Sequence, residues 1–142
     1  MTYAVSLTIP DNEAFTALEA LGRLGIPVAR VVRADIWTLE VEGAAPDLRA
    51  RIAAIETIYN PNKHRLAERG SDRPEPGEVW IAPLDDAPSA TVAGRALPGV
   101  RAVRRRTAWR LLDEGGRDVP AEVRSKAIET FLCNPAFQRA IT

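Results

Sequence analysis

The most constraining feature of the sequence is a segment that occurs twice. Residues 54–65 read AIETIYNPNKHR and residues 127–139 read AIETFLCNPAFQR, so one inserted residue in the second copy aligns them. The match continues toward the N-terminus of each copy at a nearly constant spacing of 72 to 74 residues. The best-matched pairs are Trp37 with Trp109, Leu39 with Leu111 and Ile55 with Ile128. Self-similarity at a fixed spacing indicates one structural unit used twice, and we therefore predict an internal duplication with a pseudo-twofold axis.

Length and charge narrow the class of protein. A chain of 142 residues suits one ordinary domain or two very small ones packed together. A hydrophobic content of 46% with 27% charged residues is typical of a globular protein that buries a core. The formal net charge is zero, so no overall field attracts nucleic acid or an anionic membrane, and we expect neither as a partner. Without a signal-like start or a long apolar run, a cytoplasmic protein is expected.

The first part of each copy predicts a strand, a helix and a hairpin. In the first copy, residues 3–10 form a short apolar segment typical of a strand. Asp11 or Asn12 can cap a following helix. Its apolar positions recur at helical spacing and are Phe15, Leu18, Leu21 and Leu24. Residues 28–42 are too long and too β-branched for one ordinary strand, so we expect a hairpin with its turn near residues 33–35.

The second part of each copy predicts a helix and a final strand. In the first copy we expect a helix over residues 45–59 that ends at Asn60-Pro61, because a residue before proline avoids helical angles. Its apolar stripe is Leu48, Ile52, Ile55 and Tyr59. A strand over residues 63–69 follows. The second copy predicts a strand at 79–83, a short helix at 89–97, a hairpin at 100–114, a helix at 119–132 and a strand at 137–142.

The order strand, helix, strand, strand, helix, strand is that of the ferredoxin-like fold. We therefore predict an α+β protein made of two tandem ferredoxin-like (βαββαβ) units with antiparallel sheets. The first unit spans residues 1–70, a proline-rich linker spans 71–77, and the second unit spans 78–142. Two helices cover only one face of such a sheet, so the two units would pack sheet to sheet or join edge to edge.

A strand pattern followed by a helix that ends in Asn-Pro connects both copies to a known family. The first copy reads VVRADIWTLEVE and then IETIYNPNKHRLAE; the second reads VRRRTAWRLLDE and then IETFLCNPAFQRAIT. These segments resemble the small PurS subunit of phosphoribosylformylglycinamidine synthase, and the resemblance covers most of the chain. That family forms dimers of ferredoxin-like protomers, so a tandem chain resembles a built-in dimer. The D-P-Q-G stretch that follows the family's first strand has no counterpart in residues 10–12 or 83–86.

The resemblance implies a non-catalytic structural or bridging subunit of a purine-biosynthesis complex, or a paralogue of one. Its partners would be amidotransferase and synthetase subunits. The alternative is a tandem ACT-like module that senses a small metabolite. An ACT-type site usually relies on a glycine-bearing loop after the first strand, and the loops PDNEA and PLDDAPS contain no glycine, which favours the first function. We expect a monomer or a homodimer, because the fusion already joins two protomer equivalents.

Chemistry-bearing motifs are few. The sequence contains no nucleotide-binding or metal-binding motif, so we expect no catalytic residue, no cofactor and no metal, which counts against a stand-alone enzyme. His64, the single histidine, is expected at the start of a strand. Cys133, the single cysteine, follows a helical apolar stripe and is expected to be buried. The carboxylates of Asp85-Asp86 are expected to cap the next helix.

The strongest local bias is VRAVRRRTAWR at residues 100–110, with five arginines. Arg104 and Arg106 would lie on one face of a strand and could bind an anion or a partner, with Lys63 or Arg65 of the other copy nearby. The other interpretation is a solvated strand whose arginines lie opposite Glu and Asp and discourage edge-to-edge aggregation. Both interpretations stay open at this point.

Overall fold

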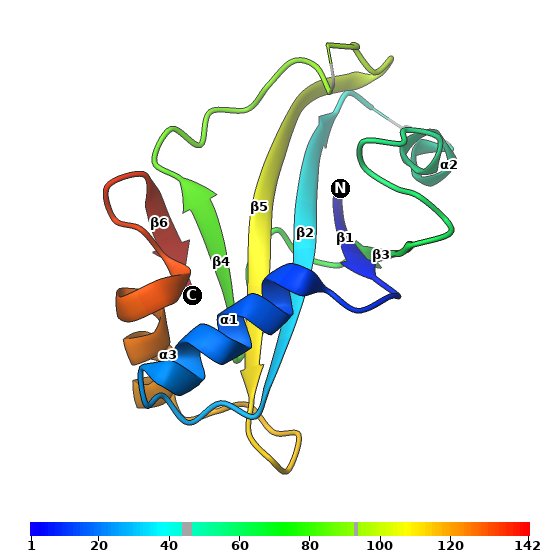
Figure 1. The fold of residues 1–142 in the computed structure, drawn as a ribbon. Coiled ribbons are helices and arrows are strands. Elements are labelled where there is room, and N and C mark those ends of the chain that lie inside the picture. Colours follow the sequence, from blue (N-terminus) through cyan, green and yellow to red (C-terminus); the bar gives the residue numbers. More distant parts are fainter. Residues whose placement is uncertain (44–46, 93) are drawn as a thin grey trace. The chain divides into compact units, whose positions relative to one another are not determined.

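The computed structural model describes residues 1–43, 47–92 and 94–142 (Figure 1). In these residues the chain has an α+β fold, as predicted, with six strands, three α-helices and one π-helical turn. The elements of the first copy are β1 (Thr2–Leu7), α1 (Asn12–Arg23), β2 (Arg30–Val41), α2 (Leu48–Ala53) and β3 (His64–Arg69). Those of the second copy are β4 (Glu78–Pro83), β5 (Val100–Leu112), α3 (Ala121–Ala127), η1 (Ile128–Leu132) and β6 (Gln138–Ile141).

The strands follow the order β3-β1-β2-β5-β4-β6. The first strand of each copy therefore lies between the last strand and the long strand of that copy, paired antiparallel with the last strand. The registers also correspond, because Tyr3 of β1 lies opposite Trp37 of β2 and Val79 of β4 lies opposite Trp109 of β5. Leu39 and Leu111 are both 1% exposed. The matched residues thus occupy matched positions in the strand pairing.

The chain divides into two compact units, and each unit contains segments of both copies. The first unit comprises Met1–Ile9, Asp35–Asp72 and Asp85–Arg105. The second unit comprises Pro10–Ala34, Arg73–Leu84 and Arg106–Thr142. The division passes through the middle of β2 and of β5. The compact units therefore differ from the two predicted repeats, residues 1–70 and 78–142. Those bounds stay a prediction of where each repeat begins and ends.

The two predicted hairpins are wrong, because β2 and β5 are single continuous strands of 12 and 13 residues. A two-residue hairpin turn needs positive φ at its central residues, which Gly, Asn and Asp supply. Arg33 and Ala34 are poorly suited to it, as are Arg105 and Arg106. All described residues with positive φ lie outside both strands. In the first copy Asp35 is the one residue suited to the turn, and its φ is not positive, so the chain continues in the extended conformation from one compact unit into the other.

The core of the first unit combines β1, β2 and α2 with a segment of the second copy. Trp37 and Leu39 of β2 pack in one cluster with Ile52 of α2, and Val41 packs against it, so these alternate residues of the strand face the core. Val92 and Val103 of the second copy belong to the same cluster. The full cluster is Tyr3, Val5, Trp37, Leu39, Leu48, Ile52, Ile58, Leu66, Val92 and Val103. Burying one leucine such as Leu39 contributes roughly 1.5–3 kcal/mol.

The helix predicted over residues 45–59 is shorter in the structure, where α2 ends at Ala53. Residues 45 and 46 of the prediction lie outside the described residues. After α2 the backbone tightens, since the amides of Ile55 and Ile58 donate to the carbonyls three residues earlier. Six residues of regular helix would place Ile58 about 120° around the axis from Ile52. The tighter turns allow both side chains to be buried in one core.

The core of the second unit combines α1 of the first copy with β4, β5 and α3 of the second. Asp11 is the N-cap of α1, as predicted, and its Oδ1 accepts from the amides of Glu13 (3.0 Å) and Ala14 (3.2 Å). Gly25, at φ 72°, follows the end of the helix. The predicted apolar stripe is partly wrong, since Phe15 and Leu24 are exposed. The buried residues of α1 are Ala14, Ala17 and Leu21, and they pack with Val79, Ile81 and Leu111.

The helix predicted over residues 119–132 is confirmed as α3 and the π-helical turn η1. The turn has a direct cause in the inserted residue. In the first copy the amide of Tyr59 donates to the carbonyl of Ile55 (2.9 Å), four residues earlier. In the second copy the amide of Cys133 donates to Ile128 (3.2 Å), five residues earlier. A single inserted residue widens a helical turn in this way.

The short helix predicted over residues 89–97 is wrong for its described residues, and residue 93 lies outside them. Ser89 instead bridges to Val103 of β5, and Val92 bridges to Arg95. The Ser89 side chain bonds the backbone of Thr91, which competes with helix formation. Consequently the carboxylates of residues 85 and 86 have no helix to cap, and that prediction is also wrong.

Candidate functional site

Two arginine–tryptophan contacts repeat at the spacing of the copies. The guanidinium of Arg33 lies 5.8 Å from the ring centre of Trp109, and that of Arg105 lies 5.3 Å from the ring centre of Trp37. Each contact joins an arginine of one copy to a tryptophan of the other within a single compact unit. Such contacts contribute about 0.5–1 kcal/mol at exposed sites. They therefore help to hold segments of the two copies together in each unit.

Both of these arginines are also paired with acids. Nε of Arg33 lies 2.8 Å from Oε2 of Glu13, and its Nη1 lies 3.8 Å from Oδ2 of Asp11. Nη2 of Arg105 donates to Oδ2 of Asp35 at 2.9 Å. The acids at the start of α1 and in the middle of β2 thus neutralise the arginines that cover the tryptophans.

The contacts of Arg104 are with the backbone and with an acid of the other copy. Nε of Arg104 donates to the main-chain carbonyl of Asp86 (3.1 Å), and its Nη1 lies 4.0 Å from Oε1 of Glu40. Its contacts do not include Lys63 or Arg65, which are exposed residues beside and in β3. Arg106 is half-buried and has an interaction partner of its own. A role for Arg104 and Arg106 in anion binding stays a prediction.

The Asn-Pro motif that defines the repeat forms the same turn twice. In the first copy, Oδ1 of Asn60 accepts from the amide of Asn62 (2.9 Å), and its carbonyl accepts from the amides of Lys63 (3.0 Å) and His64 (2.8 Å). In the second copy the corresponding bonds are donated to Asn134 by Ala136 (3.1 Å), Phe137 (3.0 Å) and Gln138 (2.8 Å). The asparagine organises the turn that begins the last strand of each copy.

A side chain four residues later closes each turn. The amide of Asn60 donates to Nδ1 of His64 at 2.9 Å, and the amide of Asn134 donates to Oε1 of Gln138 at 3.0 Å. Histidine and glutamine thus supply equivalent acceptors at equivalent positions. The single histidine begins β3, as predicted, and its Nδ1 is engaged as a structural acceptor, which favours a structural role.

The other predicted chemistry-bearing groups form no cluster. Cys133 is half-buried and packs against the core of the second unit, so the predicted apolar role is favoured. Within residues 1–43, 47–92 and 94–142, no group of three or more His, Cys, Asp or Glu side chains could hold a metal ion.

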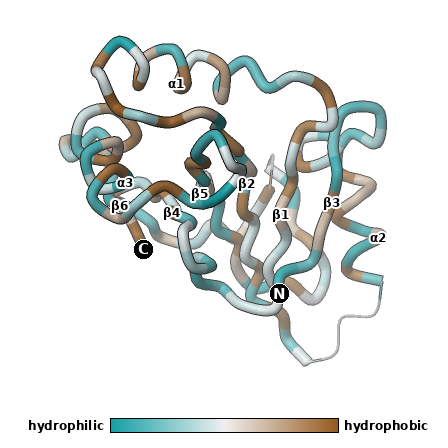
Figure 2. The backbone as a smooth tube through the Cα atoms, turned by 90° about the horizontal axis from the view of Figure 1, so that it is seen from below, coloured by the Kyte–Doolittle hydropathy of each residue, from teal (hydrophilic) through white to brown (hydrophobic). Residues whose placement is uncertain are grey.

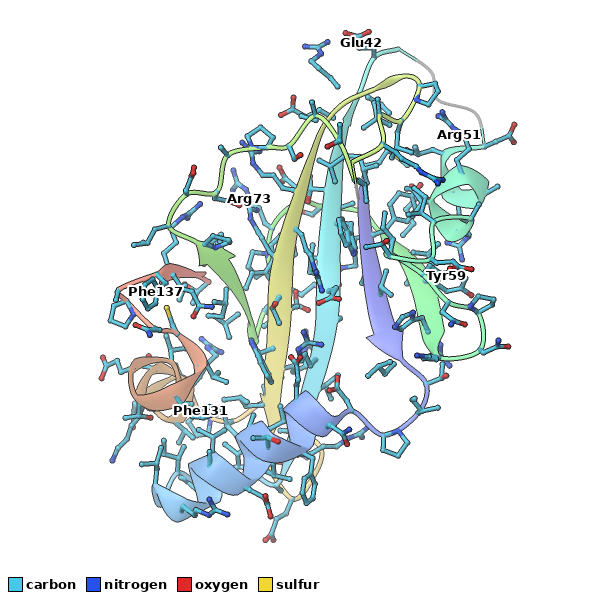
Figure 3. All side chains as sticks on the ribbon, turned by 45° about the horizontal axis from the view of Figure 1, so that its top comes forward. Glu42, Arg51, Tyr59, Arg73, Phe131 and Phe137 are labelled. Atoms are coloured by element: carbon cyan, nitrogen blue, oxygen red, sulfur yellow. The ribbon has the colours of Figure 1, made fainter. Side chains whose placement is uncertain are left out.

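The surfaces beside the two Asn-Pro turns differ sharply, although their backbones correspond. In the first unit the amide and hydroxyl of Thr8 donate to the carbonyl of Lys63 (2.7 and 3.0 Å). In the second unit the amide of Leu84 donates to the carbonyl of Phe137 (2.9 Å). Leu84 is 54% exposed and Phe137 is 70% exposed. Figure 3 labels Phe137, which lies beside the turn before β6. An exposed apolar pair therefore replaces a polar pair at matched positions.

A second apolar feature of the second unit arises from the π-helical turn. Ile58 and Leu132 are both buried, so Phe131 is the extra residue and is 41% exposed. It borders a groove of about 360 Å³ lined by Asn12, Glu13, Thr16, Trp109, Phe131 and Leu132. A contiguous exposed apolar patch is a common sign of an interaction surface, whereas a single exposed apolar side chain is ordinary.

Leu84 and Phe137 were missed as functional candidates at the level of the sequence. The signal was available, because Phe137 follows Asn134 as Lys63 follows Asn60. An apolar residue that replaces a lysine at a matched turn position indicates that the environment of that turn has changed.

None of the helices formed by the described residues has both the length and the apolar character needed to cross a membrane. Neither a protein-family model nor a curated protein sequence matches the chain.

Proposed function

We propose that the chain is a non-catalytic structural or bridging subunit similar to PurS, in a purine-biosynthesis complex or a paralogue of one. The observation that carries the proposal is the composition of the two compact units. Each unit has its own hydrophobic core, and each core is completed by residues of the other copy, as Val31 is in the second unit and Val103 in the first. This arrangement is expected of a homodimer with exchanged elements whose two chains have become one.

The strand order supports a ferredoxin-like reading of each unit. In the first unit β3 lies beside β1, β1 lies beside β2, and the first part of β5 completes the set. In the second unit β6, β4 and the second part of β5 take the same places, and the first part of β2 completes the set. We therefore propose two ferredoxin-like units that exchange one strand and the segment before it.

Fusion also explains how such a protein could bridge two different partners. A homodimer presents the same surface twice, so both partners would have to recognise one surface. In a fused chain each copy can change separately. The second unit presents Leu84 and Phe137 where the first presents Thr8 and Lys63. Two unlike surfaces suit contact with an amidotransferase subunit on one side of the complex and a synthetase subunit on the other, in the cytoplasm where purines are made.

Reconstitution tests the proposal. The purified chain is mixed with the amidotransferase and synthetase subunits encoded in the same genome, and complex formation and glutamine-dependent synthase activity are measured. We expect activity with glutamine to require the chain and activity with ammonia to be independent of it. A strain without the gene should need added purines. Binding to neither subunit, together with normal growth without purines, would refute the proposal, and calorimetric binding of an amino acid would instead support the ACT-like alternative.

A further inference from the structure

Among the described residues no strand pairs with the outer edge of β6, and the matched edge of β3 is partly capped by a side chain. Both strands stand at the ends of the strand order among the described residues (Figure 1). Nη2 of Arg49 donates to the main-chain carbonyl of Leu66 in β3 at 2.8 Å. The β3 sequence HRLAER is also mostly charged, and Figure 2 shows the strand as mainly hydrophilic. Charged side chains and a capped carbonyl are means by which proteins prevent pairing at a sheet edge.

The pairing of β6 with β4 fixes which backbone groups face outward. The carbonyl of Phe137 accepts from the amide of Leu84, and Arg139 lies opposite Ala82. Because hydrogen-bonding direction alternates along a strand, Arg139 and Ile141 direct their backbone groups toward β4. The carbonyl of Gln138 and the N–H and carbonyl of Ala140 therefore face away from β4.

We propose that the chain forms a homodimer in which two β6 strands pair antiparallel about Ala140. In this register Ala140 lies opposite Ala140 of the other chain of the dimer, and Gln138 lies opposite Thr142 of that chain. About four backbone hydrogen bonds form without using the amide of Gln138, which already donates to Asn134. A two-fold pair of this kind closes on itself and leaves no further β6 edge.

The side chains of β6 permit this pairing. Arg139 would lie opposite Ile141 of the other chain of the dimer, so no like charges face each other. Phe137 would lie diagonal to the same isoleucine, within reach of an aromatic side chain. The exposed pair Leu84 and Phe137 extends the apolar contact beyond the strand. The formal net charge of zero also means that two molecules of this chain do not repel each other, which favours a second molecule over a charged partner.

The mass in solution tests the proposal separately from the reconstitution described above, because in the dimer a second chain, and not another subunit, covers Leu84 and Phe137. Sedimentation and light scattering should show the 15.5 kDa chain associating to twice its mass as concentration rises. Ala140→Pro removes the outward N–H, and it should weaken dimerisation at least tenfold. Glu68→Pro is the matched control, because it removes an outward N–H from β3, and it should leave dimerisation unchanged. Leu84→Thr with Phe137→Lys, the residues of the first copy, should also weaken the dimer.

Cross-linking keeps the test decisive if a proline variant fails to fold. In a Cys133→Ser background, Ala140→Cys should form a disulfide-linked dimer on mild oxidation with copper phenanthroline, while Arg65→Cys in β3 should not. A chain that stays monomeric at several hundred micromolar overturns the proposal. So does a dimer unaffected by Ala140→Pro, or a series of larger species, which would indicate pairing of β6 with β3.

Discussion

The acceptor side chain that closes each Asn-Pro turn gives a sharp test, because the chain carries two natural versions of it. His64→Ala removes the acceptor of the Asn60 amide, and His64→Gln introduces the acceptor that the second copy uses at Gln138. We expect His64→Ala to destabilise the protein and His64→Gln to leave its stability nearly unchanged. The converse pair, Gln138→Ala and Gln138→His, should behave in the same way.

The magnitude follows from the burial of the two amides. Loss of one hydrogen bond costs about 0.5–1.5 kcal/mol, and more when the abandoned donor is shielded from water. The bond from Asn60 to His64 is partly buried and that from Asn134 to Gln138 is exposed, so water can replace the second more easily. We therefore expect about 1–1.5 kcal/mol for His64→Ala and about 0.5 kcal/mol for Gln138→Ala. For a chain of this size, 1 kcal/mol corresponds to about 3–5 °C in Tm.

Two measurements check this prediction. Urea unfolding at pH 8 gives the change in free energy of unfolding, and amide hydrogen exchange reports on the Asn60 and Asn134 amides directly. A loss of 1 kcal/mol should speed exchange of the Asn60 amide about fivefold in His64→Ala. The reasoning is refuted if His64→Gln destabilises the chain as much as His64→Ala, or if exchange at Asn60 is the same in all three proteins.

Three further predictions concern other parts of the molecule. Burial raises the pKa of the Tyr3 phenol, with the Glu68 carboxylate adding to the effect and Arg49 opposing it. As pH rises, the unfolded chain therefore loses the phenol proton before the folded chain does. The contribution of Tyr3 to the free energy of unfolding is fully present below about pH 10 and falls above it. Urea titrations should show that Tyr3→Phe loses less stability than the unchanged chain between about pH 8 and pH 11. Deletion of Phe131 should convert the π-helical turn to regular helix and lower the free energy of unfolding by less than about 1 kcal/mol, as measured by thermal unfolding. Deletion of Ser125 from α3 is the control. It shifts the buried face of that helix and should lower the free energy of unfolding several times more. Cleavage at a protease site inserted in the linker 71–77 should leave the two fragments bound to each other on size exclusion, because each core contains residues of both copies. Separation of the fragments without denaturant would contradict the proposed exchange of segments between the two units.

Local sequence signals were sufficient for the elements that begin and end each copy. Asp11 caps α1 because a short carboxylate before an apolar helical pattern can accept the free amides of the first turn. The strands at the ends of each copy were found from their apolar segments and from Asn-Pro, which organises the turn before the last strand. These features depend on neighbouring residues, so a single sequence can predict them.

The long strands could not be predicted in this way, because their conformation depends on pairing with strands that are distant in the sequence. A segment of 12 residues with β-branched and aromatic side chains suits a hairpin and a single strand equally well. Only the absence of a turn-forming residue between Arg33 and Asp35 distinguished them. The helix predicted at 89–97 failed for a related reason, since the backbone of Ser89 pairs with Val103 of β5. Tertiary contacts decided these cases.

The candidate site was harder to predict, because individual residue types pointed to a different surface. Arginine-rich residues 100–110 stood out by composition, yet Arg105 covers Trp37 and pairs with Asp35, and Arg104 contacts Asp86 and Glu40. The residues that now distinguish the two units are Leu84 and Phe137, whose types are ordinary and whose significance appears only beside their counterparts.

The presence of segments of both copies in each compact unit limits how far each copy can change. Arg33 belongs to the first copy but covers Trp109 of the second, and Arg105 does the reverse for Trp37. A substitution in either copy therefore affects a core that also contains residues of the other copy, so the buried residues are constrained in both. Residues that point to solvent are free of this constraint. That difference is consistent with strand registers that correspond in the two copies and with an exposed apolar pair, Leu84 and Phe137, that the first copy lacks.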